Sequence, residues 1–497
     1  MTFNFFKNPH SLKSTFVLTL VFLSCLLQAD SKRPNIILIM SDDQGWGQVG
    51  YMGHPQLKGN TPNLDEMAKT GIRFNRFYAA ASVCSPTRAS VLTGRSPRRT
   101  GVPGLHKRLC LQEKTLAQAL KKAGYATAHF GKWHLGGVQG SAMPILPDDP
   151  NGPGHYGFDE YLSATNYIEM DQLMTHNGKV VYIEGESSVR MVEAGLKFIE
   201  ANKDKPSFTV LWYGSPHFPY KASEQDMAGL PKDMDSKQRQ LLGEIVAMDR
   251  SIGMLRKRLR ELNIAENTLI WFCSDNGGRD HEPHAMAGLK GSKGSLHEGG
   301  IRVPGLIEWP GNIKPLVTDF PATTMDIMPT IIDLLDLPKD SMLDVVDGES
   351  IAPLFKGETP KRSHGIYFGN KGTALIKDKY KLVKNGNSKD MKWSLYDLEK
   401  DMAESKDLHD QFPEIVKSMS QEADAISASI DASELGKDYP EGKVIQPQRS
   451  ALWSDMEEYK KLYELFARLN PNWKAPAADK KSAKERRAEK KKKDSDK

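Results

Sequence analysis

The chain has 497 residues, of which 39% are hydrophobic and 26% are charged, and these ordinary globular fractions exclude a fibrous or largely disordered protein. This length allows one large catalytic domain with a smaller partner, or two to three average domains. The formal net charge is +5, and residues 474–497 alone contribute about +6 through eleven basic and five acidic side chains. Without a DNA-binding motif, this segment predicts a disordered basic tail and no nucleic-acid partner.

The amino terminus has the pattern of a signal peptide. Lys7 and Lys13 precede an apolar run over residues 16–27, and Ala29 offers a small residue for cleavage. The run is short for a stable membrane span and is followed by charge. We therefore expect residues 1–29 to be removed from a secreted or periplasmic protein.

Three cysteines remain after the predicted cleavage, and so small and odd a number does not fit a disulfide framework. They are Cys84, Cys110 and Cys273. We expect Cys110 and Cys273 to be buried and neutral, since neither shows metal-ligand spacing. An unpaired cysteine in an oxidising compartment needs a chemical explanation, and Cys84 is the candidate.

Four short apolar runs predict strands buried on both faces, and each ends in a polar cluster. They cover residues 35–40, 125–130, 208–213 and 268–273. Helical patterns precede or separate them at residues 61–69, 115–123 and 236–262. Alternating strands and helices predict a large, mainly parallel α/β sheet flanked by helices, in a catalytic domain over residues 33–360. Ligands bind beyond the carboxyl ends of such strands, where the polar clusters lie.

The pattern changes near residue 361. Short strands are predicted at residues 365–368, 373–376, 380–383 and 393–396, with a helix at 413–428. We expect a smaller C-terminal domain over residues 361–435, with a short antiparallel sheet and a helix. An irregular extension follows at residues 436–473, before the basic tail.

Two of the strand ends carry only oxygen ligands. Asp42 and Asp43 follow the first strand, and Asp275 and Asn276 follow the strand at 268–273. Hard cations such as Ca²⁺ or Mg²⁺ prefer this set. Each aspartate alone could simply cap the next turn. Two such pairs at equivalent strand ends favour a metal site.

Cys84 is predicted to begin a helix. Pro86 falls in the first turn, and Gly94 comes just past the last one. The positive end of the helix favours an anion there, and Arg88 lies one turn along. A cysteine at a helix start is otherwise usually a small core residue.

The sequence Cys84-Ser85-Pro86-Thr87-Arg88, followed by Leu92-Thr93-Gly94-Arg95, resembles the signature of the formylglycine-dependent (type I) sulfatases. Five further family motifs follow the family order, at residues 41–43, 131–136, 215–217, 274–277 and 293–300. The resemblance covers residues 33–404 and implies the fold of the alkaline phosphatase superfamily. It also implies that a formylglycine-generating enzyme oxidises Cys84 to formylglycine, whose geminal diol attacks sulfur, expels the alcohol and later releases sulfate from a sulfoenzyme intermediate.

The resemblance further implies roles for the surrounding residues. One Ca²⁺ would be bound by Asp42, Asp43, Asp275, Asn276 and the modified Cys84. Arg88, Lys132 and Lys293 would stabilise the diol and the sulfate oxygens. His217 would protonate the leaving oxygen, His134 would assist collapse of the intermediate, and Asp275 could help to deprotonate the attacking hydroxyl.

The sequence indicates the substrate less directly than it indicates the reaction. Residues 146–171 and 277–289 carry no motif, but they include side chains that suit a sulfated sugar or polysaccharide: Tyr156, Tyr161, Asn166, Tyr167 and Arg279. We do not expect substrate contacts from His281, His284 or His297, and His129 is expected to be structural.

Two alternatives remain at this stage. One is a phosphate or phosphonate ester hydrolase of the same superfamily, because a shared fold does not fix the reaction. The other is a non-catalytic relative that binds polyanions.

Overall fold

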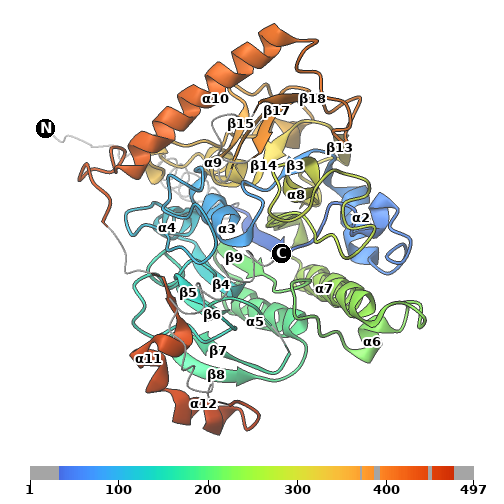
Figure 1. The fold of residues 1–497 in the computed structure, drawn as a ribbon. Coiled ribbons are helices and arrows are strands. Elements are labelled where there is room, and N and C mark those ends of the chain that lie inside the picture. Colours follow the sequence, from blue (N-terminus) through green and yellow to red (C-terminus); the bar gives the residue numbers. More distant parts are fainter. Residues whose placement is uncertain (1–32, 169, 370–371, 386–391, 446–449, 475–497) are drawn as a thin grey trace, which may run out of the picture.

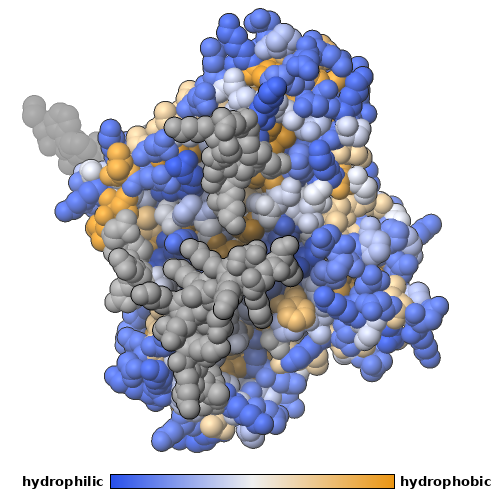
Figure 2. Space-filling view, viewed as in Figure 1, coloured by the Kyte–Doolittle hydropathy of each residue, from blue (hydrophilic) through white to orange (hydrophobic). Residues whose placement is uncertain are grey.

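The computed structural model describes residues 33–474, apart from residues 169, 370–371, 386–391 and 446–449 (Figure 1). The predicted signal peptide, and all of the predicted basic tail except Lys474, lie outside the described residues. Within the described part of the chain, no helix has the length and apolar character needed to cross a membrane. Figure 2 shows hydrophilic residues over most of the described surface in this view.

A ten-stranded sheet runs through the larger part of the protein. In spatial order its strands are β13 (Leu316–Thr318), β2 (Ile72–Phe74), β12 (Gly305–Glu308), β10 (Thr268–Ser274), β1 (Asn35–Ser41), β9 (Ser207–Trp212), β4 (Ala126–Lys132), β6 (Glu160–Ala164), β7 (Gln172–His176) and β8 (Lys179–Ile183). The central strands from β10 to β6 are all parallel, and β12, β7 and β8 introduce antiparallel pairs towards the edges. The predicted, mainly parallel sheet is confirmed, and all four predicted strands lie in its centre.

Helices cover both faces of this sheet. They are α2 (Pro62–Thr70), α3 (Cys84–Thr93), α4 (Leu116–Lys122), α5 (Ser187–Ala201), α6 (Glu224–Met227), α7 (Ser236–Glu261), α8 (Glu298–Ile301) and α9 (Ile327–Leu334). Short 3-10 turns complete the domain at Gly50–Met52, Ala265–Asn267, Thr324–Asp326, Lys339–Ser341 and Ala352–Lys356.

Successive residues of β1 face opposite sides of the sheet, as the pleat requires. Ile36 and Leu38 join a core formed with α3, α4 and α9, whereas Ile37 and Ile39 join a second core with α2, α5 and α7. β1 is therefore buried on both faces, which explains its continuous apolar sequence.

The smaller sheet also follows the prediction. Its four antiparallel strands are β15 (Ile366–Gly369), β16 (Gly372–Lys377), β17 (Tyr380–Asn385) and β18 (Ser394–Asp397). Helix α10 (Pro413–Glu434) packs across it (Figure 1) and runs six residues beyond the predicted end at residue 428. A three-stranded sheet of β11 (Arg302–Val303), β3 (Phe77–Tyr78) and β14 (Ala322–Thr323) adjoins it through the shared core of Tyr78 and Phe368.

The segment predicted to be an irregular extension is more ordered than expected. It contains β19 (Ala451–Leu452), a 3-10 turn (Trp453–Asp455), α11 (Glu457–Lys460) and α12 (Tyr463–Leu469). β19 pairs with β5 (Val138–Gln139), and Trp453, Tyr459 and Phe466 pack with Leu173 of β7. Local periodicity missed these elements because each is too short to show a pattern and is stabilised by distant partners.

A buried ion pair cluster joins the small sheet to the catalytic domain. Lys381 of β17 is fully buried, and its Nζ lies 2.9 Å from Oε1 of Glu298 in α8 and 3.1 Å from Oε1 of Glu404. Glu404 also accepts a hydrogen bond of 2.7 Å from the backbone N–H of Glu298. The single ammonium is therefore shared by two buried carboxylates, which Arg302 and His297 contact from their other sides.

We expect Lys381→Met to lower the free energy of unfolding by about 3 to 5 kcal/mol, because it removes the buried ammonium that two buried carboxylates share. Urea unfolding followed by circular dichroism measures this change. Lys377→Met in β16 is the matched control, because Lys377 is 42% exposed in its pair with Glu422 and should cost about 1 kcal/mol or less. Equal effects of the two substitutions would contradict the role given to Lys381.

Candidate active site

The parallel pairing of β1 with β10 brings the two acidic strand ends together. Ser41 lies opposite Ser274, so Asp42 and Asp43 leave β1 beside Asp275 and Asn276. The backbone N–H of Asp43 donates to Oδ1 of Asp275 at 3.1 Å, and Asn276 Nδ2 donates to Oδ1 of Asp43 at 2.9 Å. All four side chains are buried.

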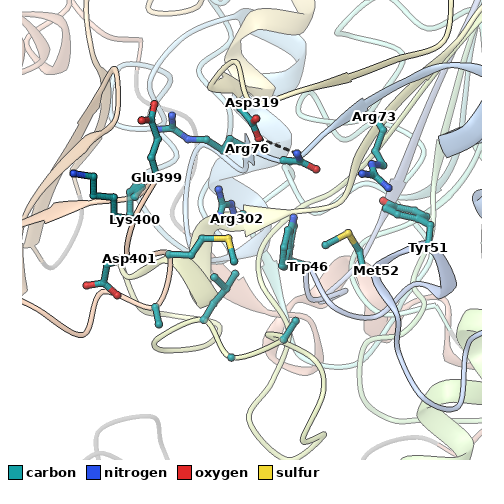
Figure 3. Close-up of a pocket in the computed structure, with 17 residues that line it drawn as sticks. Trp46, Tyr51, Met52, Arg73, Arg76, Arg302, Asp319, Glu399, Lys400 and Asp401 are labelled. Atoms are coloured by element: carbon teal, nitrogen blue, oxygen red, sulfur yellow. Dashed lines mark hydrogen bonds between the residues drawn. The ribbon is translucent and has the colours of Figure 1, made fainter.

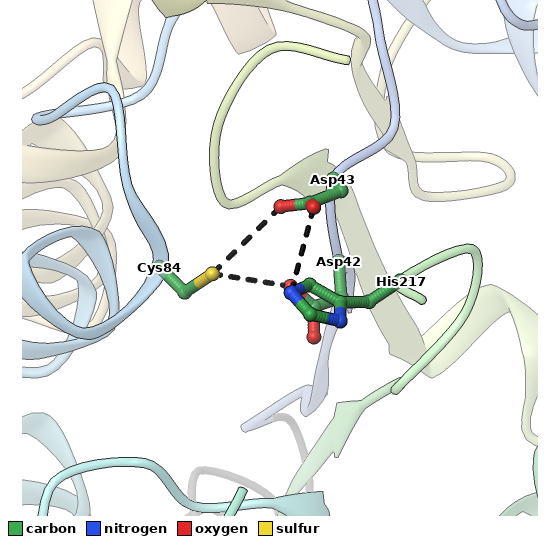
Figure 4. Close-up of side chains that lie close together, drawn as sticks. All are labelled: Asp42, Asp43, Cys84 and His217. Carbon is green, nitrogen blue, oxygen red and sulfur yellow. Dashed lines mark hydrogen bonds and ion pairs between the residues drawn. The ribbon is translucent and has the colours of Figure 1, made fainter. Parts of the chain in front are cut away.

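This arrangement fits a bound cation. Four side chains place ligand atoms within 4.8 Å of one another: Asp42, Asp43, Cys84 and His217 (Figure 4). Among the described residues, Asp43 Oδ2 and Asn276 Oδ1 are buried oxygens that accept no hydrogen bond. Buried polar atoms normally have a partner, so two orphaned oxygens beside three carboxylates suit a hard cation. Sequence reasoning did not place His217 in this cluster.

Cys84 begins α3, because Val83 is still extended and Gly94 closes the helix in the left-handed region with φ of 69°. The Cys84 thiol donates to Oδ1 of Asp42 at 3.3 Å, and Nζ of Lys293 lies 3.4 Å from Sγ. Burial, followed by the charges of Asp275 and Asp42, raises the pKa of the Cys84 thiol well above its usual value. The unmodified thiol is therefore neutral and a poor nucleophile.

Three cations balance the three carboxylates around Cys84. Arg88 donates to Oδ2 of Asp275 from Nη2 at 2.6 Å and from Nε at 3.1 Å. Lys132 Nζ lies 2.5 Å from Oδ2 of Asp42, and Lys293 Nζ lies 2.5 Å from Oδ1 of Asp43.

Although burial opposes ionisation of Asp42, Lys132 and the other nearby cations hold the pKa of this carboxyl well below its usual range. Burial and the charge of Asp42 instead raise the pKa of Asp275 to about 7. A bound cation would favour the ionised form of Asp275. Oδ2 of Asp275 accepts from Arg88 and Oδ1 accepts from the backbone N–H of Asp43, and the predicted role of Asp275 in proton transfer stays a prediction.

The two predicted histidines lie on different sides of this cluster. His217 points Nε2 at Oδ2 of Asp43 at 3.5 Å, while Nδ1 lies 2.6 Å from the Phe218 carbonyl oxygen. A carbonyl only accepts, so Nδ1 carries a proton. The ring of Tyr167 lies against that of His217, with centroids 4.7 Å apart. Burial lowers the pKa of His217.

His134 follows β4 with φ of 58° and faces a residue that the sequence did not reveal. Its Nε2 lies 3.2 Å from Nδ1 of His106, whose pKa is lowered to about 4 by burial and then by Lys132. Burial and Lys132 also lower the pKa of His134 well below its usual value. His106 belongs to a loop without a motif, so only the fold reveals this contact.

The expected sugar-contacting side chains divide into two groups. Tyr167 lies beside His217, and its ring centroid is 5.7 Å from Lys132 Nζ; Arg279 Nη1 lies 3.8 Å from Oδ2 of Asp43. Tyr156 is fully buried, and its hydroxyl donates to the Leu109 carbonyl at 2.7 Å. Asn166 is also buried and bonds to the Gly140 carbonyl, and Tyr161 lies on β6 with partial exposure. Tyr156 is thus part of the core, not a pocket wall.

The histidines and cysteines that the sequence analysis gives no catalytic role lie among other protein groups. His129 is buried beside Trp133 and Trp212 and lies 2.7 Å from Ser163 Oγ, which fits a structural role. The other three contact protein groups: His281 with Tyr220, His284 with His54, and His297 with Glu404. Cys110 and Cys273 are buried free thiols, as expected.

Comparison with known proteins gives one consistent family. Residues 34–337 match the Sulfatase family, and residues 292–429 match the family described as N-sulphoglucosamine sulphohydrolase, C-terminal. Arylsulfatase A of Homo sapiens is 32% identical over 381 residues, which cover 68% of this chain and 71% of the relative. The ulvan-active sulfatase of Formosa agariphila is 30% identical over 361 residues, covering 67% of each chain.

A solved structure extends the likeness to the C-terminal part. The crystal structure of Ps i-CgsB in complex with k-i-k-neocarrahexaose is 26% identical, with a TM-score of 0.72, and covers 88% of this chain and 98% of that chain. The two family matches, over residues 34–337 and 292–429, include the site built on Cys84 and the small sheet. The chain therefore belongs to the sulfatase family, has the alkaline phosphatase superfamily fold, and is an arylsulfatase-like hydrolase of sulfate esters.

Proposed function

We propose that this sulfatase is exported and removes sulfate from a carbohydrate, using formylglycine made from Cys84 and one Ca²⁺. The observation that carries the proposal is the position of Cys84 Sγ, 3.3 Å from Asp42 Oδ1 and 3.4 Å from Lys293 Nζ. A residue at this point touches both the acidic, metal-binding side of the site and the basic, sulfate-binding side. Its own thiol is neutral, which favours a modified nucleophile.

The proposed groups supply what the twenty ordinary side chains lack. Formylglycine would provide a hydrated aldehyde with one oxygen for attack and a second for release, and calcium would favour its ionised form. Asp42, Asp43, Asp275 and Asn276 would hold the ion through their oxygens, two of which have no hydrogen-bond partner in the described structure. Oxidation of Cys84 requires a formylglycine-generating enzyme as a partner.

A bound cation would give the site most of the positive charge that suits a sulfate monoester. Arg88, Lys132 and Lys293 together carry +3, and Asp42, Asp43 and Asp275 together carry −3 when ionised. These six groups sum to zero, the more distant Arg279 adds one positive charge at 3.8 Å from Oδ2 of Asp43, and a divalent cation would add two more. Such a site attracts an anionic ester and stabilises charge that develops on the sulfate oxygens.

The chain's own residues orient the substrate and move protons. Lys132 pairs with Asp42 and Lys293 with Asp43, and both lysines would bind sulfate oxygens. His217 presents Nε2 towards the reacting centre and is the candidate acid for the leaving oxygen, while His134, supported by His106, lies beyond Lys132. Proton transfer at the leaving oxygen by a placed side chain contributes about 10²- to 10⁴-fold in rate.

A carbohydrate substrate is supported by the surroundings and by the relatives. Tyr167 and Arg279 lie at the rim, and Phe218 beside His217 is 53% exposed. An exposed aromatic ring next to hydrogen-bonding groups suits the apolar face of a sugar. One similar sulfatase is named for ulvan, and one similar structure holds a neocarrahexaose.

Cys84→Ala should abolish sulfate release from nitrophenyl sulfate, because the nucleophile is lost, while the melting temperature stays within a few degrees. The enzyme is produced together with a formylglycine-generating enzyme, and peptide mass analysis measures the aldehyde at position 84. Cys110→Ala is the matched control, since that thiol is buried away from the site. Full activity with an unmodified Cys84 would contradict the proposal, and an unmodified, inactive chain that binds polyanions would favour the non-catalytic alternative.

Removal of divalent cations should lower turnover by at least about 100-fold, because the site then loses most of its positive charge. Dialysis against a chelator, followed by titration with Ca²⁺ or Mg²⁺, measures this effect. We expect Ca²⁺ to restore activity and Asp43→Asn to weaken its binding. Full activity in the chelator would contradict a metal-dependent site.

We expect kcat/KM for nitrophenyl sulfate to exceed that for nitrophenyl phosphate by at least about 100-fold, since residues 34–337 match the Sulfatase family and the site is built to stabilise charge on sulfate oxygens. Parallel initial rates with both esters measure this ratio, and a preference for phosphate would support the phosphatase alternative. Release of sulfate from sulfated galactose, fucose, galactosamine and glucosamine units then tests the carbohydrate assignment. Activity confined to aryl esters would contradict it.

A further inference from the structure

A cavity lies apart from the catalytic residues described above. It has a volume of about 820 Å³ and is lined on one side by Trp46 and Tyr51, from the chain after β1, and on the other by residues 398–403, after β18 (Figure 3). None of the residues assigned above to metal, nucleophile or proton transfer lines it. The cavity is therefore distinct from the site at Cys84.

Two arginines enter this cavity while resting on aromatic rings. The guanidinium of Arg302 lies over Trp46 with 5.2 Å to the ring centroid, and that of Arg73 lies over Tyr51 at 5.8 Å. Stacking fixes the plane of a guanidinium and leaves the N–H groups at its edge free to bind oxyanions. Two stacked arginines in one cavity form a preorganised anion-binding wall.

Arg302 has donors that the protein does not satisfy. It is 2% exposed, and its Nε lies 3.4 Å from Oε2 of Glu298. Within the described part of the chain, its Nη1 is buried without a hydrogen-bond partner, as is Nε of Arg73. These nitrogens are themselves buried, so an anion in the cavity would be attracted by the charge of the two arginines and not by these particular N–H groups.

Acidic side chains share the same cavity. Asp319 accepts a hydrogen bond from Asn75 at 2.8 Å, and Glu399 and Asp401 lie on the opposite side. Carboxylates accept hydrogen bonds from hydroxyl groups and repel closely spaced phosphates. Alternating cations and carboxylates therefore suit a ligand that carries both hydroxyl and anionic groups.

The cavity continues into a neighbouring one. The neighbouring cavity has a volume of about 730 Å³ and shares three lining residues with the cavity of about 820 Å³: Arg76, Asp319 and Glu399. Its further lining includes four basic side chains: Lys361, Arg362, Lys377 and Lys379. The two cavities, which share three lining residues, are together named here the arginine groove, and either volume is larger than a single ion needs.

We propose that the arginine groove is a second binding site for a sulfated oligosaccharide, separate from the site of hydrolysis. The choice of a sulfated sugar as ligand rests on the proposed function, whereas the anion-binding geometry does not. Nucleic acid fits less well, because Trp46 is 7% exposed and Arg302 covers its ring, so no free platform remains there for a base. The enzyme would hold one part of a polyanionic chain here while cleaving a sulfate ester elsewhere.

Binding of a sulfated hexasaccharide to the full-length Cys84→Ala chain tests this proposal by isothermal titration. Replacement of two groove cations in R73Q/K400E should weaken binding by at least about tenfold, because charge-assisted contacts are lost. Glu399→Gln should tighten binding about two- to threefold, since it removes a repelling carboxylate. A gain of affinity cannot arise from misfolding, and melting curves check the folding of the double variant.

The matched control is Lys257→Glu, a charge reversal on α7 at a side chain that is 74% exposed and outside both cavities. We expect it to change affinity less than twofold. The proposal is overturned if the hexasaccharide does not bind, if R73Q/K400E and K257E behave alike, or if a single-stranded oligonucleotide binds more tightly than the hexasaccharide. Sulfate release by the unsubstituted enzyme is measured separately, so a failure of the proposed catalytic function is distinguished from a failure of this second site.

Discussion

The pairing of β1 with β10 is the constraint on which the site depends. Two parallel strands in register place Asp42 and Asp43 against Asp275 and Asn276, and this concentrates negative charge in a buried space. Buried carboxylates persist only with compensation. The compensating cations come from a helix, a strand end and a loop, and they are Arg88, Lys132 and Lys293. The carboxylates of one strand pair therefore hold three distant parts of the chain together.

Charge balance also limits what Cys84 can do in its unmodified form. The thiol lies among groups that already neutralise one another, so nothing in its surroundings strongly favours a thiolate, and burial opposes one. A nucleophile that works here must gain its reactivity from its own chemistry and from a bound cation. On the proposed mechanism, the same residues would both stabilise the fold and position the reacting group.

Much of this arrangement could be predicted because its sequence signals are local. The central strands are continuous apolar runs, and the residues that follow them, such as Asp42 and Asp275, share one edge of any parallel sheet. Contacts between distant loops could not be predicted: His106 meets His134 only in the folded chain. The burial of Tyr156, which was expected to contact a sugar, could not be predicted, because a tyrosine in a segment without a motif shows no pattern that indicates burial. The helices after residue 450 were missed because each depends on packing with β5 and β7.

The burial of Cys84 has a consequence for how the enzyme is made. The side chain is 1% exposed and enclosed by the first turn of α3, the end of β1 and Lys293. No second enzyme could reach such a sulfur in the finished fold. Oxidation of Cys84 would therefore have to occur while the chain is still unfolded, so the timing of synthesis, export and folding would set the fraction of molecules that ever become active.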